Sequence, residues 1–198
     1  MTLTSLPKML LSDTEGWADV ARSRPSVAKL FLSLVVPLSL IPPLMYAYAQ
    51  LVQPGVVFAP VEPPLAVGEL ALVGGLFFLA EIANVALMGY YIQQLAAIAG
   101  VRPDYASAYM LAAIAPTPLW LSALALFVPN LWVNVLTVSA AWVATVALIR
   151  HGVRPLLQVA SEAAARRLAN AITAAGVAAW IAMLLVFLML LGMLLGWR

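Results

Sequence analysis

The residue with the clearest chemical potential in this sequence is Glu81, which lies inside the apolar run "ALVGGLFFLAEIANVALMGYY" at residues 71–91. A charge at the centre of a membrane-spanning helix costs about 2.5–3.5 kcal/mol, so a carboxyl group there marks a candidate functional site. Helical spacing places one stripe of residues on a common face, namely Gly74, Phe77, Glu81, Asn84, Met88 and Tyr91. One interpretation is a protonatable intramembrane site with Asn84 as its neighbour. The other is a neutral carboxyl group that is hydrogen-bonded within a helix bundle.

A second unusual stretch is "IAPTPLWLS" at residues 114–122, where two prolines lie two residues apart in an apolar run. Proline has no N–H and its ring clashes with the preceding turn, which costs about 3 kcal/mol inside a helix. In a bilayer, neighbouring helices, hydroxyl side chains or water can satisfy the freed carbonyl groups. We therefore predict a helix break at Pro116, Thr117 and Pro118, which either shapes the bundle or forms a hinge or an ion site. A similar distortion is predicted earlier in the chain, at Pro37, Pro42 and Pro43.

The sequence lacks the usual motifs of catalytic and cofactor chemistry. It has one histidine and no cysteine, which excludes two-histidine metal sites, thiolate ligands and cysteine nucleophiles. Neither the G-x-S-x-G motif nor a phosphate-binding glycine loop occurs. We therefore expect a non-enzymatic protein with no metal and no cofactor. A net charge of +2 also gives no reason to expect a nucleic-acid partner.

Composition identifies the solvent around these residues. Hydrophobic residues make up 65% of the 198-residue chain and charged residues only 9%, against about 25% charged residues in soluble domains. The chain is therefore predicted to be an all-α membrane protein that crosses the bilayer several times. Apolar runs of about 20 residues indicate five spans, at residues 30–51, 66–99, 105–127, 131–149 and 171–195. A short N-terminal segment, residues 1–28, precedes a membrane domain of residues 29–198.

The positions of the basic residues predict the orientation of this five-span bundle. Nine of the ten fall on one side of it: Lys8, Arg22, Arg24, Lys29, Arg102, Arg150, Arg154, Arg166 and Arg167. Only Arg198 falls on the other side. Because basic residues concentrate in cytoplasmic loops, the N-terminus is predicted to be cytoplasmic and the C-terminus outside.

Two segments beside the spans have helical signals of their own. Ser12 and Glu15 have capping-box spacing, which predicts a short interfacial helix around Trp17, although a solvated leader is the alternative. The stretch "RPLLQVASEAAARRLAN" at residues 154–170 places Pro155 at the first position of a helix and pairs Glu162 with Arg166. We expect this stretch to form an interfacial or protruding helix that leads into the last span.

Several local features of the chain occur together in one known family. They are the Pro116–Pro118 pair with Leu119 and Leu121–Ser122 after it, the short turn at Pro129, Trp17 in the leader, and Arg102–Pro103 before Tyr105–Tyr109. With these features the stretch "YMLAAIAPTPLWLSALALFVPNLW" resembles the Yip family, five-span membrane proteins whose eukaryotic members interact with Rab GTPases. The resemblance covers most of the chain.

The resemblance implies a helical bundle with a cytoplasmic N-terminus, and it carries no defined activity. Eukaryotic members have a longer cytosolic N-terminal region than the segment of residues 1–28 here. A Rab-type partner is therefore not expected, and the resemblance fits a member from the bacterial inner (plasma) membrane better.

The functional expectation is a protein that organises the membrane or binds other membrane proteins, further copies of itself included. Faces of small residues support close helix contact, as in "ALALF", "SAAWVATVA" and "AITAAGVAAW", and the same faces also serve packing within the bundle. One alternative is a small transporter or channel component that uses Glu81 and the broken third span. Another is an accessory subunit of a larger membrane complex.

Overall fold

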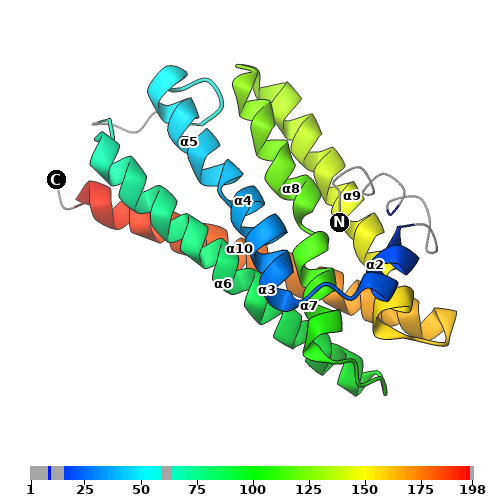
Figure 1. Ribbon diagram of the computed structural model, residues 1–198. Helices are drawn as coiled ribbons and strands as arrows, with labels where there is room; N and C mark the ends of the chain where they lie inside the picture. The colour runs from blue at the N-terminus through cyan, green and yellow to red at the C-terminus, as the bar shows by residue number, and fades with distance from the viewer. Residues whose placement is uncertain (1–8, 10–15, 59–63, 197–198) are drawn as a thin grey trace.

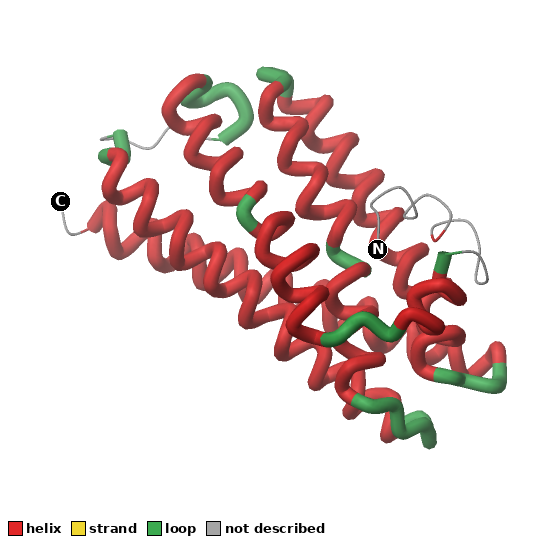
Figure 2. Tube along the Cα trace, in the orientation of Figure 1, coloured by secondary structure: helices red, strands yellow, loops and turns green. Residues whose placement is uncertain are grey.

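The computed structural model describes residue 9, residues 16–58 and residues 64–196. Every regular element in these residues is a helix, and no strand occurs among them (Figure 1 and Figure 2). Five stretches are long and apolar enough to cross a membrane, at Val27–Val52, Val67–Ile98, Tyr105–Phe127, Leu131–Leu157 and Glu162–Met193. The predicted all-α bundle of five transmembrane helices is therefore confirmed.

Two of the spans are built from several short helical elements. The first contains α3 (Val27–Leu30), the π-helix η2 (Phe31–Val35), α4 (Val36–Ser39) and α5 (Ile41–Val52). The third contains α7 (Tyr105–Ile114), α8 (Thr117–Ser122) and the 3₁₀-helix η3 (Ala123–Phe127). The others are single helices, α6 (Val67–Ile98), α9 (Leu131–Leu157) and α10 (Glu162–Gly196), and α2 (Trp17–Ser23) precedes the first span. The two composite spans are the two in which several prolines lie.

The prolines of the first span lie where helical elements begin. Pro37 and Pro42 are the second residues of α4 and α5, where a missing N–H is tolerated because the first turn has no intrahelical acceptor. A turn at Leu40 separates the two elements. The Ser39 hydroxyl donates a hydrogen bond to the Val35 carbonyl oxygen at 2.7 Å. The distortion that the prolines predict for this span is present.

The segment before the first span folds back onto the bundle. The predicted short helix is present as α2, whereas Ser12 and Glu15 lie outside the described residues. Trp17 is completely buried, and its Nε1–H donates a hydrogen bond to the Met9 carbonyl oxygen at 2.9 Å. The helix packs against α9. It is therefore part of the folded core and not a solvated leader.

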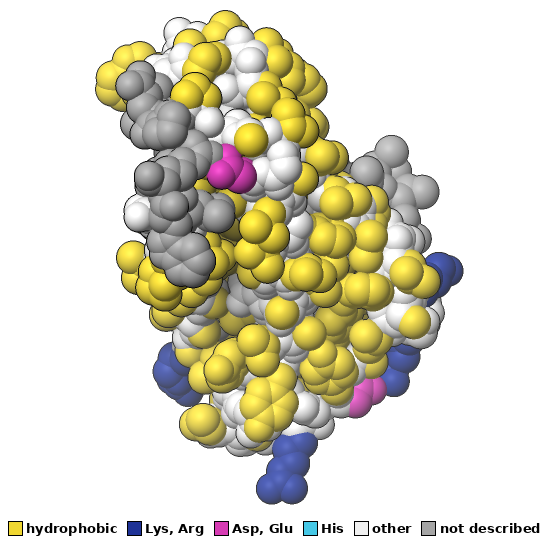
Figure 3. All heavy atoms as spheres, turned by 90° about the vertical axis from the view of Figure 1, so that its left-hand side faces the viewer, with side chains coloured by type: hydrophobic (Ala, Val, Ile, Leu, Met, Phe, Trp, Pro, Cys, Tyr) yellow, Lys and Arg dark blue, Asp and Glu magenta, His cyan; other side chains and the backbone are white. Residues whose placement is uncertain are grey.

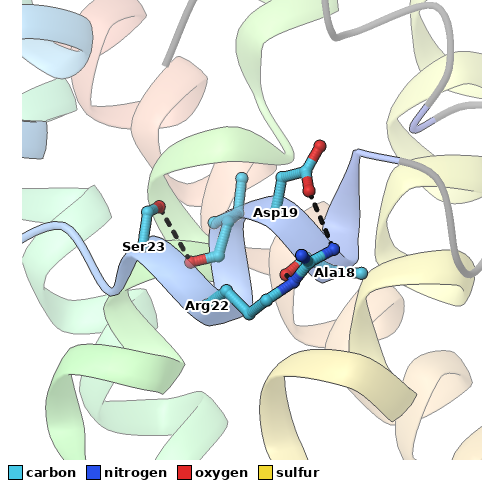
Figure 4. Close-up of polar contacts among 5 residues, drawn as sticks. Ala18, Asp19, Arg22 and Ser23 are labelled. Carbon is cyan, nitrogen blue, oxygen red and sulfur yellow. Dashed lines mark hydrogen bonds and ion pairs between the residues drawn. The ribbon is translucent and has the colours of Figure 1, made fainter.

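The exposed side of α2 carries polar groups (Figure 4). Arg22 forms an ion pair with Asp19 at 3.0 Å, and its Nε–H donates to the Ala18 carbonyl oxygen at 3.3 Å. The Ser23 hydroxyl donates to the Val20 carbonyl oxygen at 3.3 Å. These local bonds satisfy the polar groups of a short helix whose opposite side is buried.

The fourth span is longer than predicted, and Pro155 does not begin a helix. Instead of ending at residue 149, α9 continues to Leu157 with Pro155 inside it, and Gln158 ends it in the left-handed conformation at φ 56°. A proline so close to the end removes a single backbone hydrogen bond. Leu156 and Leu157 become buried in the core, which offsets that loss.

The stretch predicted as an interfacial helix and the last span are one helix. After a short connection, α10 begins at Glu162 and runs through residue 171, where the last span was expected to start. The Ser161 hydroxyl oxygen accepts a hydrogen bond from the Ala164 N–H at 3.4 Å, and the predicted Glu162–Arg166 pair is present at 2.9 Å. The helix is continuous because its alanine-rich first turns contain no residue that breaks a helix.

The hydrophobic core lies toward the end of the bundle at which α2 packs. Its largest fully buried side chains include Trp17, Ile92, Leu111, Leu148 and Ile172. A second, small cluster of Met45, Ala49 and Leu126 lies toward the other end. On the face shown in Figure 3, the Lys and Arg side chains all lie in the lower part of the molecule, while hydrophobic side chains cover most of the rest. One end of the bundle is thus tightly packed, and the other is more open.

Candidate functional site

A partly open cavity of about 900 Å³ lies between the helices of the bundle, and all five spans contribute to its wall. The residues at its inner end belong to the main core: Ile92, Leu111, Ile149 and Ile172. Toward the other end the wall includes Val57, Phe58, Leu131 and Leu191. Along α6 the lining runs from Gly74 to Ile92, which is roughly 27 Å at 1.5 Å per residue. The cavity therefore extends over most of the thickness of a bilayer's hydrocarbon core.

Large aromatic side chains hold α10 to its neighbours around this cavity. The rings of Trp142 and Trp180 meet edge to face at 5.3 Å between centroids. Phe187 meets Phe77 at 5.3 Å and Tyr46 at 5.4 Å in the same manner. These ring pairs connect α9, α6 and α5 to α10 without filling the space between the helices.

Glu81 lies in the α6 wall of the cavity. Its side chain is only 6% exposed, and its Oε2 atom has no hydrogen-bond partner. The Trp120 side chain of α8 lies within hydrogen-bonding reach of the carboxyl group. The described residues of the cavity wall include no lysine, arginine or histidine, so no cation of the wall neutralises a carboxylate there. A buried carboxyl group in this setting either keeps its proton or requires a donor within the cavity.

Thr145 is a second buried polar residue of the wall, and it is not among the residues predicted from the sequence. It is 6% exposed, it lies on α9, and its Oγ1 atom has no hydrogen-bond partner. A threonine in a helix commonly donates to a carbonyl one turn earlier. Thr137 and Thr173 do so, to Val133 and Ala169, each at 2.8 Å. No sequence signal distinguishes Thr145 from these two threonines.

Two other polar residues of the wall have hydrogen-bond partners. The Asn134 amide donates to the carbonyl oxygens of Val128 at 3.1 Å and Asn130 at 2.8 Å. The Ser139 hydroxyl donates to the Val135 carbonyl oxygen at 2.7 Å. Among the described residues of the wall, Glu81 and Thr145 are those with a buried polar atom that has no hydrogen-bond partner.

The third span breaks one turn before Trp120. α7 ends at Ile114 and α8 begins at Thr117, with Pro116 between them. Pro118 has no N–H to donate to the Ile114 carbonyl oxygen, and the Thr117 hydroxyl donates to that oxygen instead, at 2.8 Å. Of the three predicted residues, Pro116 lines the cavity, whereas Thr117 and Pro118 do not, and Thr117 is completely buried elsewhere in the bundle.

The stripe predicted on α6 lies mostly in the cavity wall. Gly74, Phe77, Glu81, Asn84 and Met88 line it, whereas Tyr91 is exposed and Ile92 takes its place in the wall. Gly74 lies against α5, and a Cβ atom added to it would lie 3.5 Å from the Cβ of Pro43, an ordinary van der Waals contact, so alanine would also fit there. Across the described residues, no group of three or more His, Cys, Asp or Glu side chains is arranged to hold a metal ion.

Comparison with known proteins identifies the family. A model of the Yip1 domain matches residues 8–196. The chain belongs to the Yip1 domain family. No curated protein and no solved structure matches it.

Family membership and the five spans together define this Yip1-domain protein as a multi-pass integral membrane protein. The match extends over α2 and over every residue that lines the cavity. The cavity is therefore part of the Yip1 domain itself.

Proposed function

We propose that this Yip1-domain protein is a non-enzymatic membrane organiser that binds another membrane protein within the bilayer, through the outer side of α10. The observation that carries the proposal is the exposure of the most apolar part of the last span. None of the residues in its most apolar 18-residue window is buried, whereas half of the corresponding window of the third span is. The bacterial inner membrane stays the predicted location.

The surface in question is a stripe on α10 that faces away from the cavity. Its members are spaced four residues apart and are largely exposed, namely Ile181, Leu185, Met189 and Met193. We call these residues the α10 outer stripe. Side chains four residues apart form a ridge that fits the groove of another helix. Lipid covers such a stripe equally well, so the experiment must distinguish contact with lipid from contact with another membrane protein.

The test is purification of the tagged full-length chain in mild detergent, followed by mass spectrometry. The double variant Leu185→Ala and Met189→Ala shortens the α10 outer stripe. A matched control, Leu72→Ala with Leu79→Ala, shortens exposed side chains of α6 that do not line the cavity. We expect one stoichiometric partner with the unmodified chain and with the control, and a reduced yield of it with the α10 variant. Equal yields for both variants would overturn the proposal.

Self-association is one form of the same function, and a second tag identifies it. When two differently tagged copies are expressed together, recovery of both in one complex shows that the partner is a second copy. The α10 variant should then separate the two tags, and the α6 control should not.

A second candidate function is transport, for which the burial of Glu81 in the cavity wall is the favourable observation. The wall is otherwise mostly apolar, which provides few groups to replace the hydration shell of an ion. The test is proton or ion flux in liposomes. A flux that Glu81→Gln abolishes while the protein stays folded would favour transport over partner binding.

A further inference from the structure

The last two spans, α9 and α10, separate along their length. They contact each other, and Figure 1 shows them close together where α10 begins and far apart where α9 begins. The packing of α10 follows the same course. Its buried residues are Ala165, Leu168, Ala169 and Ile172, and none of its described side chains after Ile172 is buried. The two helices therefore leave a space between them toward the end of the bundle that is away from the main core.

The exposure of the cavity wall shows that this space is the opening of the cavity. The rings of Trp142 and Trp180 connect α9 to α10 partway along both helices. Between this pair and the main core, the lining residues of the two helices are buried or partly exposed, and Val146 and Gly176 are among the partly exposed ones. Beyond the pair, several lining residues are exposed, namely Leu131, Val135, Ser139 and Leu188. The cavity thus opens between α9 and α10, beyond the tryptophan pair.

The opening faces the hydrocarbon of the bilayer. It lies between two candidate spans, and neither residues 131–149 nor residues 168–193 include a charged side chain. Water is a poor occupant of the cavity, because most of the wall offers it no hydrogen bonds. The remaining occupants are those that a bilayer provides at this depth, which are the chain of a lipid and the helix of another membrane protein.

The volume of the cavity distinguishes these two occupants. A helix is about 10 Å wide with its side chains, so over the roughly 27 Å that α6 lines it would fill about 2,000 Å³. That is more than twice the cavity volume of about 900 Å³. A hydrocarbon chain is about 4–5 Å wide by the contact distance of its carbon atoms, so over the same length it fills roughly 400 Å³. The cavity therefore accommodates a lipid chain and excludes a helix.

We propose that the cavity holds an acyl chain of a bilayer phospholipid, which enters between α9 and α10 and extends past the tryptophan pair to Val146 and Gly176. The apolar wall binds the chain by contact alone. The head group stays outside, where the two helices offer it no charged partner. This site is separate from the α10 outer stripe, because the residues of that stripe do not line the cavity.

The experiment uses the full-length chain in phosphatidylcholine liposomes. A small fraction of the lipid carries a photoreactive diazirine near the end of one acyl chain, and peptide mapping after irradiation quantifies the label at each residue. We expect label at Val146 and Gly176, which line the cavity on the core side of the tryptophan pair. Leu136 of α9 is the internal standard, because it is exposed and does not line the cavity. Label at Leu136 without label at Val146 or Gly176 would overturn the proposal and leave the cavity to another occupant.

A variant that fills the cavity tests the position of the chain. Gly176 lines the cavity, and nothing lies within 4 Å of a Cβ atom added to it, so Gly176→Phe places a ring in the path of the chain. The label at Val146, relative to Leu136, should fall by about five-fold or more. Gly75→Phe is the matched control, because its added Cβ atom also has open space and the residue does not line the cavity. That control should keep the label at Val146.

A second variant serves if Gly176→Phe does not fold, which thermal unfolding shows. Val146→Phe fills the cavity from α9, and the label is then measured at Thr173, a partly exposed lining residue of α10. Unchanged label in a folded variant of either kind would show that the chain does not occupy the cavity.

The head group is tested with the same diazirine chain on phosphatidylglycerol. Because the chain alone is bound, we expect the label at Val146 relative to Leu136 to equal that from phosphatidylcholine. A preference of about five-fold or more for either lipid would overturn binding by the chain alone. None of these results affects partner binding through the α10 outer stripe, so the two proposals fail separately.

Discussion

Gly152 lies on α9 against the buried ring of Trp17, where α2 packs onto the bundle. A Cβ atom at this position would lie 2.7 Å from Cη2 of Trp17 and 2.8 Å from Cδ1 of Leu111. The leucine methyl group can move, but the indole is fully buried and is held by its hydrogen bond to Met9. Because glycine has no Cβ atom, Gly152 allows α2 to pack against α9.

Replacement of this glycine should destabilise the protein. Alanine gains about 1 kcal/mol in helix propensity over glycine, whereas overpacking against a rigid ring costs about 1–3 kcal/mol. We expect Gly152→Ala to lower the Tm in detergent, measured by tryptophan fluorescence. Gly75→Ala is the control, because nothing lies within 4 Å of its added Cβ atom, and its Tm should be equal or higher. A Gly152→Ala variant as stable as the control would show that α2 can shift at no cost.

Asp104 is the N-cap residue of α7 and lies between the second and third spans. Its Oδ1 accepts a hydrogen bond from the Ser107 N–H at 2.8 Å. Hydrogen bonds from the side chain and the backbone of Ser107 lower the pKa of Asp104, and the nearby charge of Arg24 lowers it further. The carboxylate is thus stabilised in the folded state more than in the unfolded state.

This difference predicts a pH dependence of the cap. The pKa of Asp104 in the folded protein is below the unfolded value of about 3.9. Its contribution to the free energy of unfolding is therefore complete above that pH and is lost as the pH falls through the folded pKa. Asp104→Ala should therefore lower the free energy of unfolding by about 0.5–1 kcal/mol near neutral pH, with a smaller effect at about pH 3. Asp104→Asn keeps an N-cap acceptor and should remove the pH dependence. Thermal unfolding between neutral pH and about pH 3 measures this pH dependence. If the alanine variant lost the same stability at every pH, Asp104 would not act as a charged N-cap.

At the scale of whole elements, one side chain stabilises the break between α7 and α8. The Thr117 hydroxyl supplies the hydrogen bond to the Ile114 carbonyl oxygen that Pro118 cannot supply. Thr117 is completely buried, so no water can replace its hydroxyl. The sequence predicted the position of the break from the prolines, and the structure shows which atom compensates for it.

Removal of that hydroxyl should destabilise the third span. Thr117→Val keeps the shape of the side chain but leaves a buried carbonyl without a partner, which should cost about 1–3 kcal/mol and lower the Tm. Thr117→Ser should retain most of the stability. Adding Pro118→Ala to Thr117→Val restores a backbone N–H near Ile114 and should recover part of the loss. If the double variant is no more stable than Thr117→Val, the missing donor is not the cause.

The segmentation of α9 and α10 shows how far element boundaries can be predicted. The Glu162–Arg166 pair was predictable because its spacing is local. The prediction that a helix begins at Pro155 was wrong. Proline is common at the start of a helix, but here it lies within the last turns of α9. The burial of Leu156 and Leu157 decides this boundary, and burial depends on helices that are distant in the sequence.

At the scale of the whole molecule, five spans place the two ends of the chain on opposite sides of the bilayer. The orientation with a cytoplasmic N-terminus stays a prediction from the basic residues. A reporter fused after Arg198 that is fluorescent only in the cytosol should therefore stay dark. The same reporter in the connection between α9 and α10 should be bright. The reverse pattern would invert the orientation, and equal signals would contradict the number of spans.

The sequence alone determined that a lipid bilayer surrounds the chain, that there are five spans, and that Glu81 lies within one of them. These properties depend on composition and on local runs of residues. The sequence could not predict the docking of Trp17 on Gly152, the cavity or the unsatisfied hydroxyl of Thr145. Thr145 lies in an apolar helical stretch, as Thr137 and Thr173 do, and the hydrogen bond that it does not make sets it apart from them. Which atoms remain without partners is decided by how the helices meet, and that is a property of the tertiary structure.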